Sequence, residues 1–322
     1  MGLKYKREIV KKNIEDTQWL LQEFESIDMA CKKYIDDLHG IITKSRKFKD
    51  SPPVLMLSGG IDSMMLGCIL KKYFGLEKSI TIGCVKDTHD IIVSKDTAEK
   101  LGIEQQLIFV TLNEVLDNLH LCRGRNIRTV FNLVYYLMFK LCLKNINVKS
   151  LDLVQGEGAD TLLGSIQTFC YRDVPWVMDN FKVDRDLAKT IVKQTYYAEK
   201  INPDRNIEKG SGHLFLEAAN ELGANPIMAF KHPKTLRWVN DLHYNFARPD
   251  KKLLPKKVIE YLGYDPINVK RTIMEKGTGI YEIIQKKICQ MTEKNHPNTA
   301  LKTIVNSNPI EWEKLKEKLV YD

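Results

Sequence analysis

The sequence predicts an α/β protein in which a parallel sheet carries helices on both faces, with an N-terminal helical extension and a C-terminal helical lobe. Short apolar runs alternate with stretches of helical periodicity across residues 50–165, and strands that alternate with helices form parallel sheets. Glycine-rich turns directly follow two of these apolar runs. Beyond residue 170 helical periodicity dominates, so we expect the strands to lie before that point.

Two helices are expected before the first strand, over residues 7–25 and 26–48. In the second, apolar residues such as Cys31, Tyr34 and Leu38 recur at steps of three and four. A Ser-Pro-Pro sequence then interrupts the chain at residues 51–53. Residues 1–50 are therefore predicted to form a helical extension.

The α/β core is predicted over residues 51–170, and its expected strands are 54–57, 79–85, 106–111 and 151–154. The longest expected helix of the core spans residues 126–145. Residues 171–322 are predicted to form a mostly helical lobe. The expected helices there are 176–200, 213–223, 232–246, 255–262, 266–276, 280–292 and 309–319. We expect a ligand in a cleft between core and lobe.

The composition is that of a globular protein with a hydrophobic core. Of the 322 residues, 43% are hydrophobic and 28% are charged, which argues against disorder and collagen-like repeats. No apolar run approaches the ~18 residues that cross a bilayer, and the first residues lack the apolar stretch of a secretory signal. We therefore expect a cytoplasmic protein without a membrane partner.

The net charge indicates which ligands the protein could bind, and the cysteine spacing indicates whether to expect zinc sites or disulfides. Forty-nine Lys and Arg against 41 Asp and Glu give a formal charge of +8. This excess suits a polyanion such as ATP, pyrophosphate or nucleic acid, although a solvated lysine-rich surface gives the same count. The seven cysteines form no CxxC pair, which argues against a structural zinc site or a disulfide framework.

The strongest local motif is SGGIDS at residues 58–63, which follows an expected strand and precedes an expected helix. The two glycines let the backbone turn tightly and approach an anion, and the serine hydroxyls can donate to phosphate oxygens. Backbone N–H groups at the start of a helix attract phosphate. Asp62 would repel phosphate unless it holds a divalent cation. A helix start with a capping Asp is the alternative.

A second glycine-rich segment, GEGADTLLG at residues 156–164, follows the last expected strand. The carboxyl ends of parallel strands at a switch point are where such folds bind ligands. Asp160 and Asp62 would then share a Mg²⁺ ion on the triphosphate. A strand-to-helix turn with a capping Asp is the alternative here.

The first motif resembles the PP-loop of the N-type ATP pyrophosphatases. The string GEGADTLLGS is similar to the GEGSDELFGG segment of asparagine synthetase and its relatives, the β-lactam and carbapenam synthetases. Asn225-Pro226-Ile227 and the Leu-Leu-Pro sequence at residues 253–255 resemble later parts of that synthetase domain. The resemblance implies an adenine nucleotide alpha hydrolase-like, Rossmann-like fold.

The resemblance also implies a reaction and a set of site residues. A carboxylate-type oxygen would attack ATP at the α-phosphorus and release pyrophosphate, and ammonia or an amine would then displace AMP. The implied residues for nucleotide binding are Leu57, Ser58, Gly59, Gly60, Asp62, Ser63, Val85, Gly156 and Gly158. Asp62 and Asp160 would hold Mg²⁺.

Two residues are expected to act in acyl transfer. Glu157 could serve as a base or orient the amine, although a turn position explains it equally. Lys276, in a Lys-Gly-Thr-Gly sequence, matches the lysine that stabilises acyl transfer in the β-lactam synthetase branch, and a lysine charge suits an oxyanion. Lys270 and Arg271 are rivals, and an exposed lysine before a helix-ending glycine is the alternative.

The chain also departs from asparagine synthetase. Position 2 is Gly rather than the cysteine nucleophile of a glutaminase domain, and only about 50 residues precede the PP-loop. Ammonia would be free, come from a separate glutaminase, or be replaced by an amine. A PP-loop enzyme that adenylates tRNA or a nucleobase, and an ATP-binding subunit without catalysis, stay open as alternatives.

Overall fold

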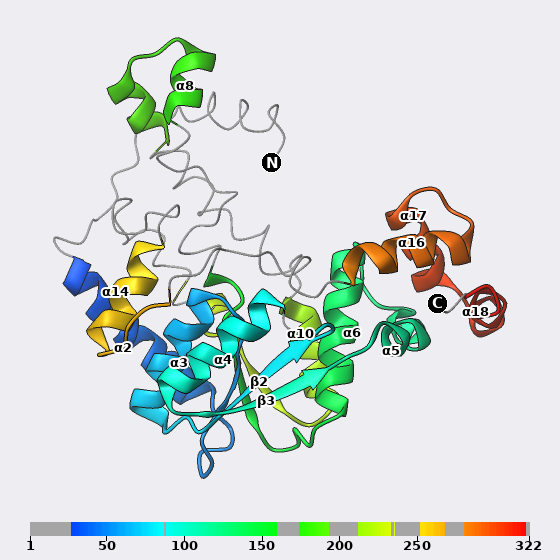
Figure 1. Ribbon diagram of the computed structural model, residues 1–322, viewed down its shortest axis with the longest axis horizontal. Helices are drawn as coiled ribbons and strands as arrows, with labels where there is room; N and C mark the ends of the chain where they lie inside the picture. The colour runs from blue at the N-terminus through cyan, green and yellow to red at the C-terminus, as the bar shows by residue number, and fades with distance from the viewer. Residues whose placement is uncertain are drawn as a thin grey trace.

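Five parallel strands form the sheet at the centre of the molecule (Figure 1). The computed structural model describes residues 27–86, 88–159, 174–192, 212–232, 235, 252–267 and 280–319. The strands are β1 Val54–Met56, β2 Lys78–Gly83, β3 Glu104–Phe109, β4 Asp152–Gln155 and β5 Asn225–Ile227. Their order is β3-β2-β1-β4-β5. The predicted parallel sheet with helices is confirmed.

The helices of the described residues lie before, between and after these strands. The helices up to β4 are α2 Ile27–Ser45, α3 Ile61–Phe74, α4 His89–Leu101, α5 Leu112–Asp117 and α6 Val130–Lys144, with a 3-10 turn at Leu119–Cys122. Those after β4 are α8 Val174–Phe181, α10 Gly212–Asn220, α14 Leu253–Tyr261, α16 Tyr281–Thr292, α17 Pro297–Asn306 and α18 Pro309–Lys316, with a 3-10 turn, η4, at Ala229–Lys231.

Two hydrophobic clusters cover the two faces of the sheet. On one face, Leu55 and Val154 pack with apolar residues of α2, α3 and α14. On the other face, Met56 and Leu153 pack with α6, α10 and the C-terminal helices α16–α18, which extend beside α6 in Figure 1. Neighbouring residues of one strand thus enter opposite clusters, because side chains alternate across a strand.

The side of the sheet on which successive strands are added changes between β1 and β4. From β1 the chain adds β2 and β3 on one side, and it later adds β4 and β5 on the other. Met56 pairs with Gln155 in the register of these two strands. The two glycine-rich segments that follow β1 and β4 therefore leave the sheet side by side, at the switch point where open parallel sheets bind ligands.

The fifth strand is a difference from the sequence expectation. No strand was expected beyond residue 170, yet residues 225–227 pair with β4 as the edge strand. Pro226 lacks an N–H, and a proline is tolerated at a sheet edge. α17, with Pro297 at its start, was not expected either. The helices predicted over 7–25, 232–246 and 266–276 lie wholly or mostly outside the described residues.

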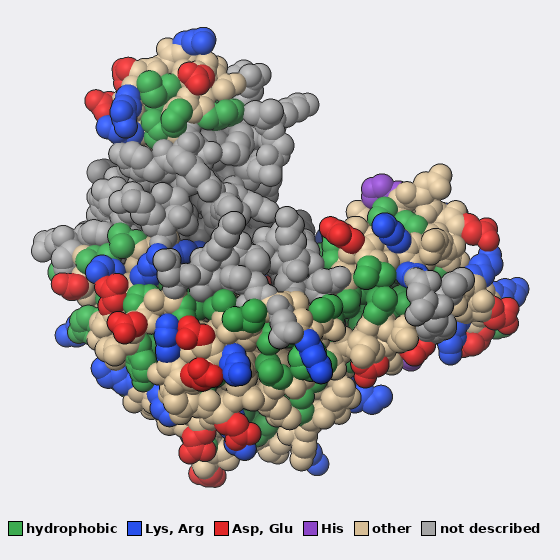
Figure 2. All heavy atoms as spheres, in the orientation of Figure 1, with side chains coloured by type: hydrophobic (Ala, Val, Ile, Leu, Met, Phe, Trp, Pro, Cys, Tyr) green, Lys and Arg blue, Asp and Glu red, His purple; other side chains and the backbone are tan. Residues whose placement is uncertain are grey.

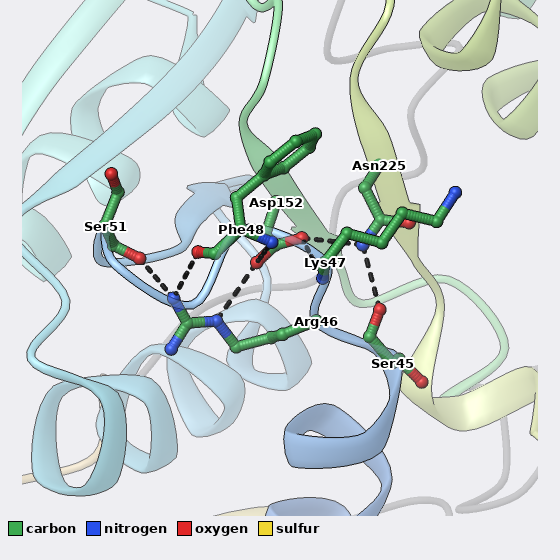
Figure 3. Close-up of polar contacts among 7 residues, drawn as sticks. All are labelled: Ser45, Arg46, Lys47, Phe48, Ser51, Asp152 and Asn225. Carbon is green, nitrogen blue, oxygen red and sulfur yellow. Dashed lines mark hydrogen bonds and ion pairs between the residues drawn. The ribbon is translucent and has the colours of Figure 1, made fainter.

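The amino ends of the strands form one edge of the sheet, here called the amino edge. At this edge, β4 is hydrogen-bonded to the segment between α2 and β1. Asp152, whose side chain is 0% exposed, accepts from Arg46 Nε at 3.1 Å and from Asn225 Nδ2 at 2.6 Å (Figure 3). It also accepts from the backbone N–H groups of Lys47 at 3.0 Å and Phe48 at 3.3 Å. α2 is thereby joined to the same core as β4 and β5. The division of the chain at residues 50 and 170 stays a prediction.

Candidate functional site

The loop after β1 is anchored to the sheet at its first residue. The N–H of Leu57 donates to the carbonyl of Ile80 at 2.8 Å. The Leu57 carbonyl accepts from the hydroxyl of Thr81 at 2.8 Å, and Gln105 donates to that hydroxyl at 2.8 Å. The starting point of the loop is therefore fixed by two neighbouring strands.

The two serines of the motif close the loop onto the start of α3. The Ser63 hydroxyl lies 2.9 Å from the carbonyl of Ser58, 2.7 Å from the carbonyl of Gly60 and 3.1 Å from the Ser58 hydroxyl. Gly60 precedes α3 in an extended conformation, with φ −93° and ψ 146°. The N-terminus of a fourteen-residue helix thus faces the loop, as an anion site requires.

Gly59 has no space for a side chain. A Cβ at this position would lie 2.8 Å from the Cα of Asp90 and 3.1 Å from its carbonyl oxygen. Asp90 belongs to the first turn of α4, so this helix start packs directly against the loop. The glycine is required by backbone packing as well as by access for an anion.

The segment after β4 lies against the same helix start. A Cβ on Gly156 would be 3.6 Å from the backbone N and Cα of Ser63, so the two glycine-rich segments are in van der Waals range. Gly158 has φ +96°, a conformation that favours glycine. Residues 58–63 and 156–158 therefore lie close together at the carboxyl ends of β1 and β4.

Glu157 is held by two side chains from other elements. Its Oε1 pairs with Lys231 Nζ at 2.8 Å, and its Oε2 accepts from the hydroxyl of Tyr135. Gln155 donates to the same hydroxyl at 2.6 Å. Burial, together with the charge of Glu157, raises the pKa of Tyr135 well above its usual value, so the phenol stays protonated and remains a donor.

The start of α10 leaves space for this ion pair. A Cβ on Gly212 would overlap Lys231 Nζ and would lie 3.0 Å from Met228 Sδ and 3.1 Å from Glu157 Oε1. Any other residue at position 212 would displace the pair. The Glu157 carboxylate is thus bordered by Gly212, Lys231 and Tyr135.

Asp62 also has a lysine partner. Its Oδ2 lies 2.9 Å from Lys252 Nζ, and the two side chains are 18% and 14% exposed. Asp62 is in the first turn of α3, and Lys252 directly precedes α14. A group 190 positions away in the sequence thus contacts the loop.

The described part of the site fits Mg²⁺–ATP. The glycine-rich loop offers backbone N–H groups for phosphate, and Asp62 offers carboxylate oxygens. Magnesium is usually held by one or two carboxylates, with phosphate and water completing its shell. Among the described residues no group of three or more His, Cys, Asp or Glu forms a metal cluster.

Of the remaining predicted site residues, the structure describes only Val85. Val85 follows the carboxyl end of β2 and is 49% exposed. Asp160 and Lys276 lie outside the described residues, as do Lys270 and Arg271. The roles of all these residues stay predictions.

Cys84 lies just past the carboxyl end of β2, near enough to the site to raise the question of a nucleophile. Burial raises the pKa of its thiol to about 12, and it donates to Met138 Sδ at 3.2 Å. A thiol in this state is unreactive at neutral pH. The six described cysteines are all free.

Four residues of the site escaped the sequence analysis: Tyr135, Gly212, Lys231 and Lys252. Tyr135 is part of a long apolar helix, and the lysines belong to a lysine-rich chain, so neither stands out locally. Gly212 follows a Gly-Ser pair that reads as an ordinary turn. Only the packing of distant elements brings them to the switch point.

Comparison with models of protein families gives a match over most of the chain. A family model described as asparagine synthase matches residues 39–246, more than half of the chain. No curated protein is significantly similar. Among the described residues no helix has the length and apolar character that crossing a membrane demands.

Solved structures with some similarity include two enzymes. One is the U34-tRNA thiolase NcsA from Methanococcus maripaludis with its 4Fe-4S cluster, at 15% identity and a TM-score of 0.35, covering 89% of this chain and 80% of that one. The other is the NH3-dependent NAD synthetase from Campylobacter jejuni subsp. jejuni NCTC 11168 in complex with the nitrate ion. It has 12% identity and a TM-score of 0.35, and covers 77% of this chain and 100% of that one.

Proposed function

Because this chain belongs to the asparagine synthase family, we propose that it is an ATP-dependent C–N ligase that forms AMP and pyrophosphate. The observation that carries the proposal is the close approach of Gly156 to the backbone of Ser63, where the two glycine-rich segments leave the sheet at its reversal point. This is where a parallel sheet binds a nucleotide. The proposed substrates are ATP, a small-molecule carboxylate, and ammonia or an amine.

The reaction is proposed to proceed in two displacements. An oxygen of the substrate carboxylate forms a bond to the α-phosphorus of ATP, and the bond to the β-phosphate oxygen breaks to release pyrophosphate. The nitrogen of ammonia or of the amine then attacks the acyl carbon, loses a proton and displaces AMP. The protein contributes positioning and neutralisation of charge.

The residues have separate proposed roles. The loop N–H groups and serine hydroxyls bind the phosphates. Asp62 and Asp160 would hold Mg²⁺, which would supply positive charge to the pyrophosphate group. Glu157 accepts the proton of the attacking amine or orients it. Lys276 remains the residue we propose for stabilising acyl transfer, by placing positive charge near the oxyanion.

The direct test is exchange of labelled pyrophosphate into ATP across a panel of carboxylates, with and without ammonia. Carboxylate-dependent exchange is expected from the wild-type protein. Asp62→Ala and Asp160→Ala should each abolish exchange and AMP formation, and Asp96→Ala should not, because Asp96 is 52% exposed in a surface pair with Lys100. Retained exchange in both variants would remove the metal assignment.

The same assay separates the alternatives. ATP binding without pyrophosphate release would support a non-catalytic subunit. Exchange that needs added RNA, with RNA binding that weakens steeply as salt rises, would support a nucleic-acid substrate. The charge of +8 favours that reading, but on the face drawn in Figure 2 the described basic and acidic side chains are interspersed.

The source of nitrogen and the compartment complete the proposal. We propose a cytoplasmic enzyme that uses free ammonia, ammonia from a separate glutaminase, or an amine substrate. Amide formation with ammonium salts alone would show that a glutaminase is not required. Formation only with an amine would exclude ammonia as the natural nucleophile.

A further inference from the structure

Lys231 reaches Glu157 through space that two glycines leave open. A Cβ on Gly158 would lie 3.0 Å from Lys231 Cγ, and a Cβ on Gly212 would overlap Lys231 Nζ. Gly158 belongs to the segment after β4, and Gly212 is the first residue of α10. Two elements far apart in the chain thus lack side chains along the stem and at the ammonium of the same lysine. The position of this ammonium is therefore specified by its surroundings.

The ion pair between Lys231 and Glu157 is largely removed from water but still reaches it. Lys231 Nζ lies 2.8 Å from Glu157 Oε1, and the two side chains are 11% and 19% exposed. The Tyr135 hydroxyl donates to the other carboxylate oxygen. In a buried ion pair desolvation offsets the attraction, whereas loss of one partner leaves an unpaired charge that is strongly unfavourable. A ligand that binds at this pair must therefore satisfy both charges at once.

An amine without a negative group does not meet this requirement. Glu157 is the residue proposed to accept the proton of the attacking amine or to orient it, so the amine must contact its carboxylate. An amine that takes the place of the Lys231 ammonium leaves that ammonium, 11% exposed, without its carboxylate. Ammonia and simple alkylamines bring no anion in compensation. The unpaired charge therefore disfavours them as ligands.

An amino acid carries both complementary charges at a matching separation. Its amino nitrogen and its carboxylate oxygens lie about 3 Å apart by covalent geometry, and Lys231 Nζ and Glu157 Oε1 lie 2.8 Å apart. Among the described residues Lys231 Nζ donates to Glu157, so two of its three N–H groups are left for a ligand carboxylate. The positive end of α10, a nine-residue helix that begins at Gly212, adds to the charge beside that carboxylate.

We propose that the nucleophile is an amino acid, bound with its amino group on Glu157 and its carboxylate on Lys231. The inference rests on the proposed function and names the class of the amine. The amino group transfers one proton to Glu157, and its lone pair forms the C–N bond to the acyl carbon. The nitrogen then loses a second proton to water. The bond between the acyl carbon and the AMP oxygen breaks with its electrons on AMP, and the product is an N-acyl amino acid.

Amide formation with matched nucleophiles tests this assignment. A carboxylate that supports pyrophosphate exchange is supplied with Mg²⁺–ATP and with ammonium, each common amino acid, or the corresponding amino acid amide. The amide keeps the amino group but lacks the negative charge. For the wild type we expect kcat/KM for the best amino acid to exceed that for its amide and for ammonium at least about tenfold, because only the amino acid makes the charge-assisted contact with Lys231.

Variants of Lys231 test the residue itself through the ratio of kcat/KM for the amino acid to that for its amide, which a general loss of activity leaves unchanged. Lys231→Met should lower this ratio to about twofold or less, and Lys231→Arg should retain most of it. If Lys231→Met unfolds, Lys231→Gln decides, because its amide can still donate to Glu157. The matched control is Lys140→Met. Lys140 is 13% exposed and pairs with Glu221 just past the other end of α10, so the ratio should stay at the wild-type value.

Equal kcat/KM for amino acids and their amides in the wild type, or ammonium as the best nucleophile, would overturn the inference and leave the proposed function standing. A ratio that persists in a folded Lys231→Met or Lys231→Gln protein would also overturn it, because another group would then bind the carboxylate. Exchange without amide formation from any of these nucleophiles would have the same consequence. Absence of carboxylate-dependent exchange in the wild type, a step that needs no amine, would remove the proposed function itself and this inference with it.

Discussion

At the amino edge of the sheet, Asp152 is bound by two backbone N–H groups, by Asn225 and by Arg46 (Figure 3). At the carboxyl edge, Asp62 pairs with Lys252, and Glu157 pairs with Lys231 and Tyr135. Two of the four groups that bind the amino-edge carboxylate are thus backbone N–H groups. Each carboxyl-edge carboxylate instead pairs with a lysine, whose side chain can turn toward a ligand.

We interpret this difference as that between a structural carboxylate and carboxylates with a proposed role in ligand binding. Backbone N–H groups cannot leave Asp152 unless the connection between α2 and β1 opens, so its bonds are lost only on unfolding. Lysine has a flexible stem and can exchange one anion for another. Substitutions at the amino edge should therefore act on stability, and those at the carboxyl edge on ligand binding and rate.

The largest effect is expected at Asp152. Asp152→Ala removes the acceptor of four hydrogen bonds and leaves Arg46 without its carboxylate. Breaking a buried pair costs about 3–5 kcal/mol, so the urea midpoint should fall accordingly. Asp96→Ala should change the free energy of unfolding by less than about 1 kcal/mol. A stable Asp152→Ala protein that has lost pyrophosphate exchange would contradict the structural role that we assign to the amino-edge carboxylate.

Gly59→Ala should affect stability less and ligand binding more. The added Cβ would lie 2.8 Å from the Cα of Asp90, so the loop or α4 must shift, at a cost of about 1–3 kcal/mol. We expect ATP affinity to fall at least about tenfold, since the loop then departs from its phosphate geometry. Isothermal titration with ATP measures this.

Gly40→Ala is the matched control for that variant. Gly40 is in α2, and a Cβ there meets nothing within 4 Å. Alanine in a helix is favoured over glycine by about 0.5–1 kcal/mol, so this variant should be slightly more stable and bind ATP normally. Unchanged ATP affinity in Gly59→Ala would show that the loop tolerates a side chain.

Tyr135→Phe should have an intermediate effect on the free energy of unfolding and on the rate of pyrophosphate exchange. Glu157 and Gln155 lose a shared hydroxyl partner, and a buried polar group without its partner costs about 1–3 kcal/mol. Pyrophosphate exchange should slow, because Glu157 then loses one of the groups that orient its carboxylate. Tyr136→Phe is the control, since the Tyr136 hydroxyl is buried without a hydrogen-bond partner among the described residues; it should be neutral.

The smallest expected effect concerns pH. Burial and Glu157 raise the pKa of Tyr135 above its ordinary value of 10.0, so the phenol keeps its proton as pH rises toward that value. The ratio of the exchange rates of wild type and Tyr135→Phe should therefore stay constant from about pH 8 to about pH 10. A ratio that changes steadily across this interval would show that the phenol ionises there.

Much of the fold could be predicted from local sequence patterns, and the reasons can be given for particular residues. The SGGIDS loop lies between a buried strand and a helix because apolar runs and glycines encode those elements within a few positions. The edge strand at Asn225–Ile227 was missed. Two of its three residues, Asn225 and Pro226, carry little strand preference, and pairing with β4 makes the segment a strand.

The sequence by itself determined the parallel sheet, the two glycine-rich segments that follow β1 and β4, and the family to which the chain belongs. These depend on contiguous residues, whose conformations and motifs are encoded locally. The tertiary structure decided that Lys252 lies on Asp62 and that Tyr135, Lys231 and Gly212 surround Glu157. Contacts between residues far apart in the chain depend on how helices pack over the sheet, and no local pattern specifies that packing.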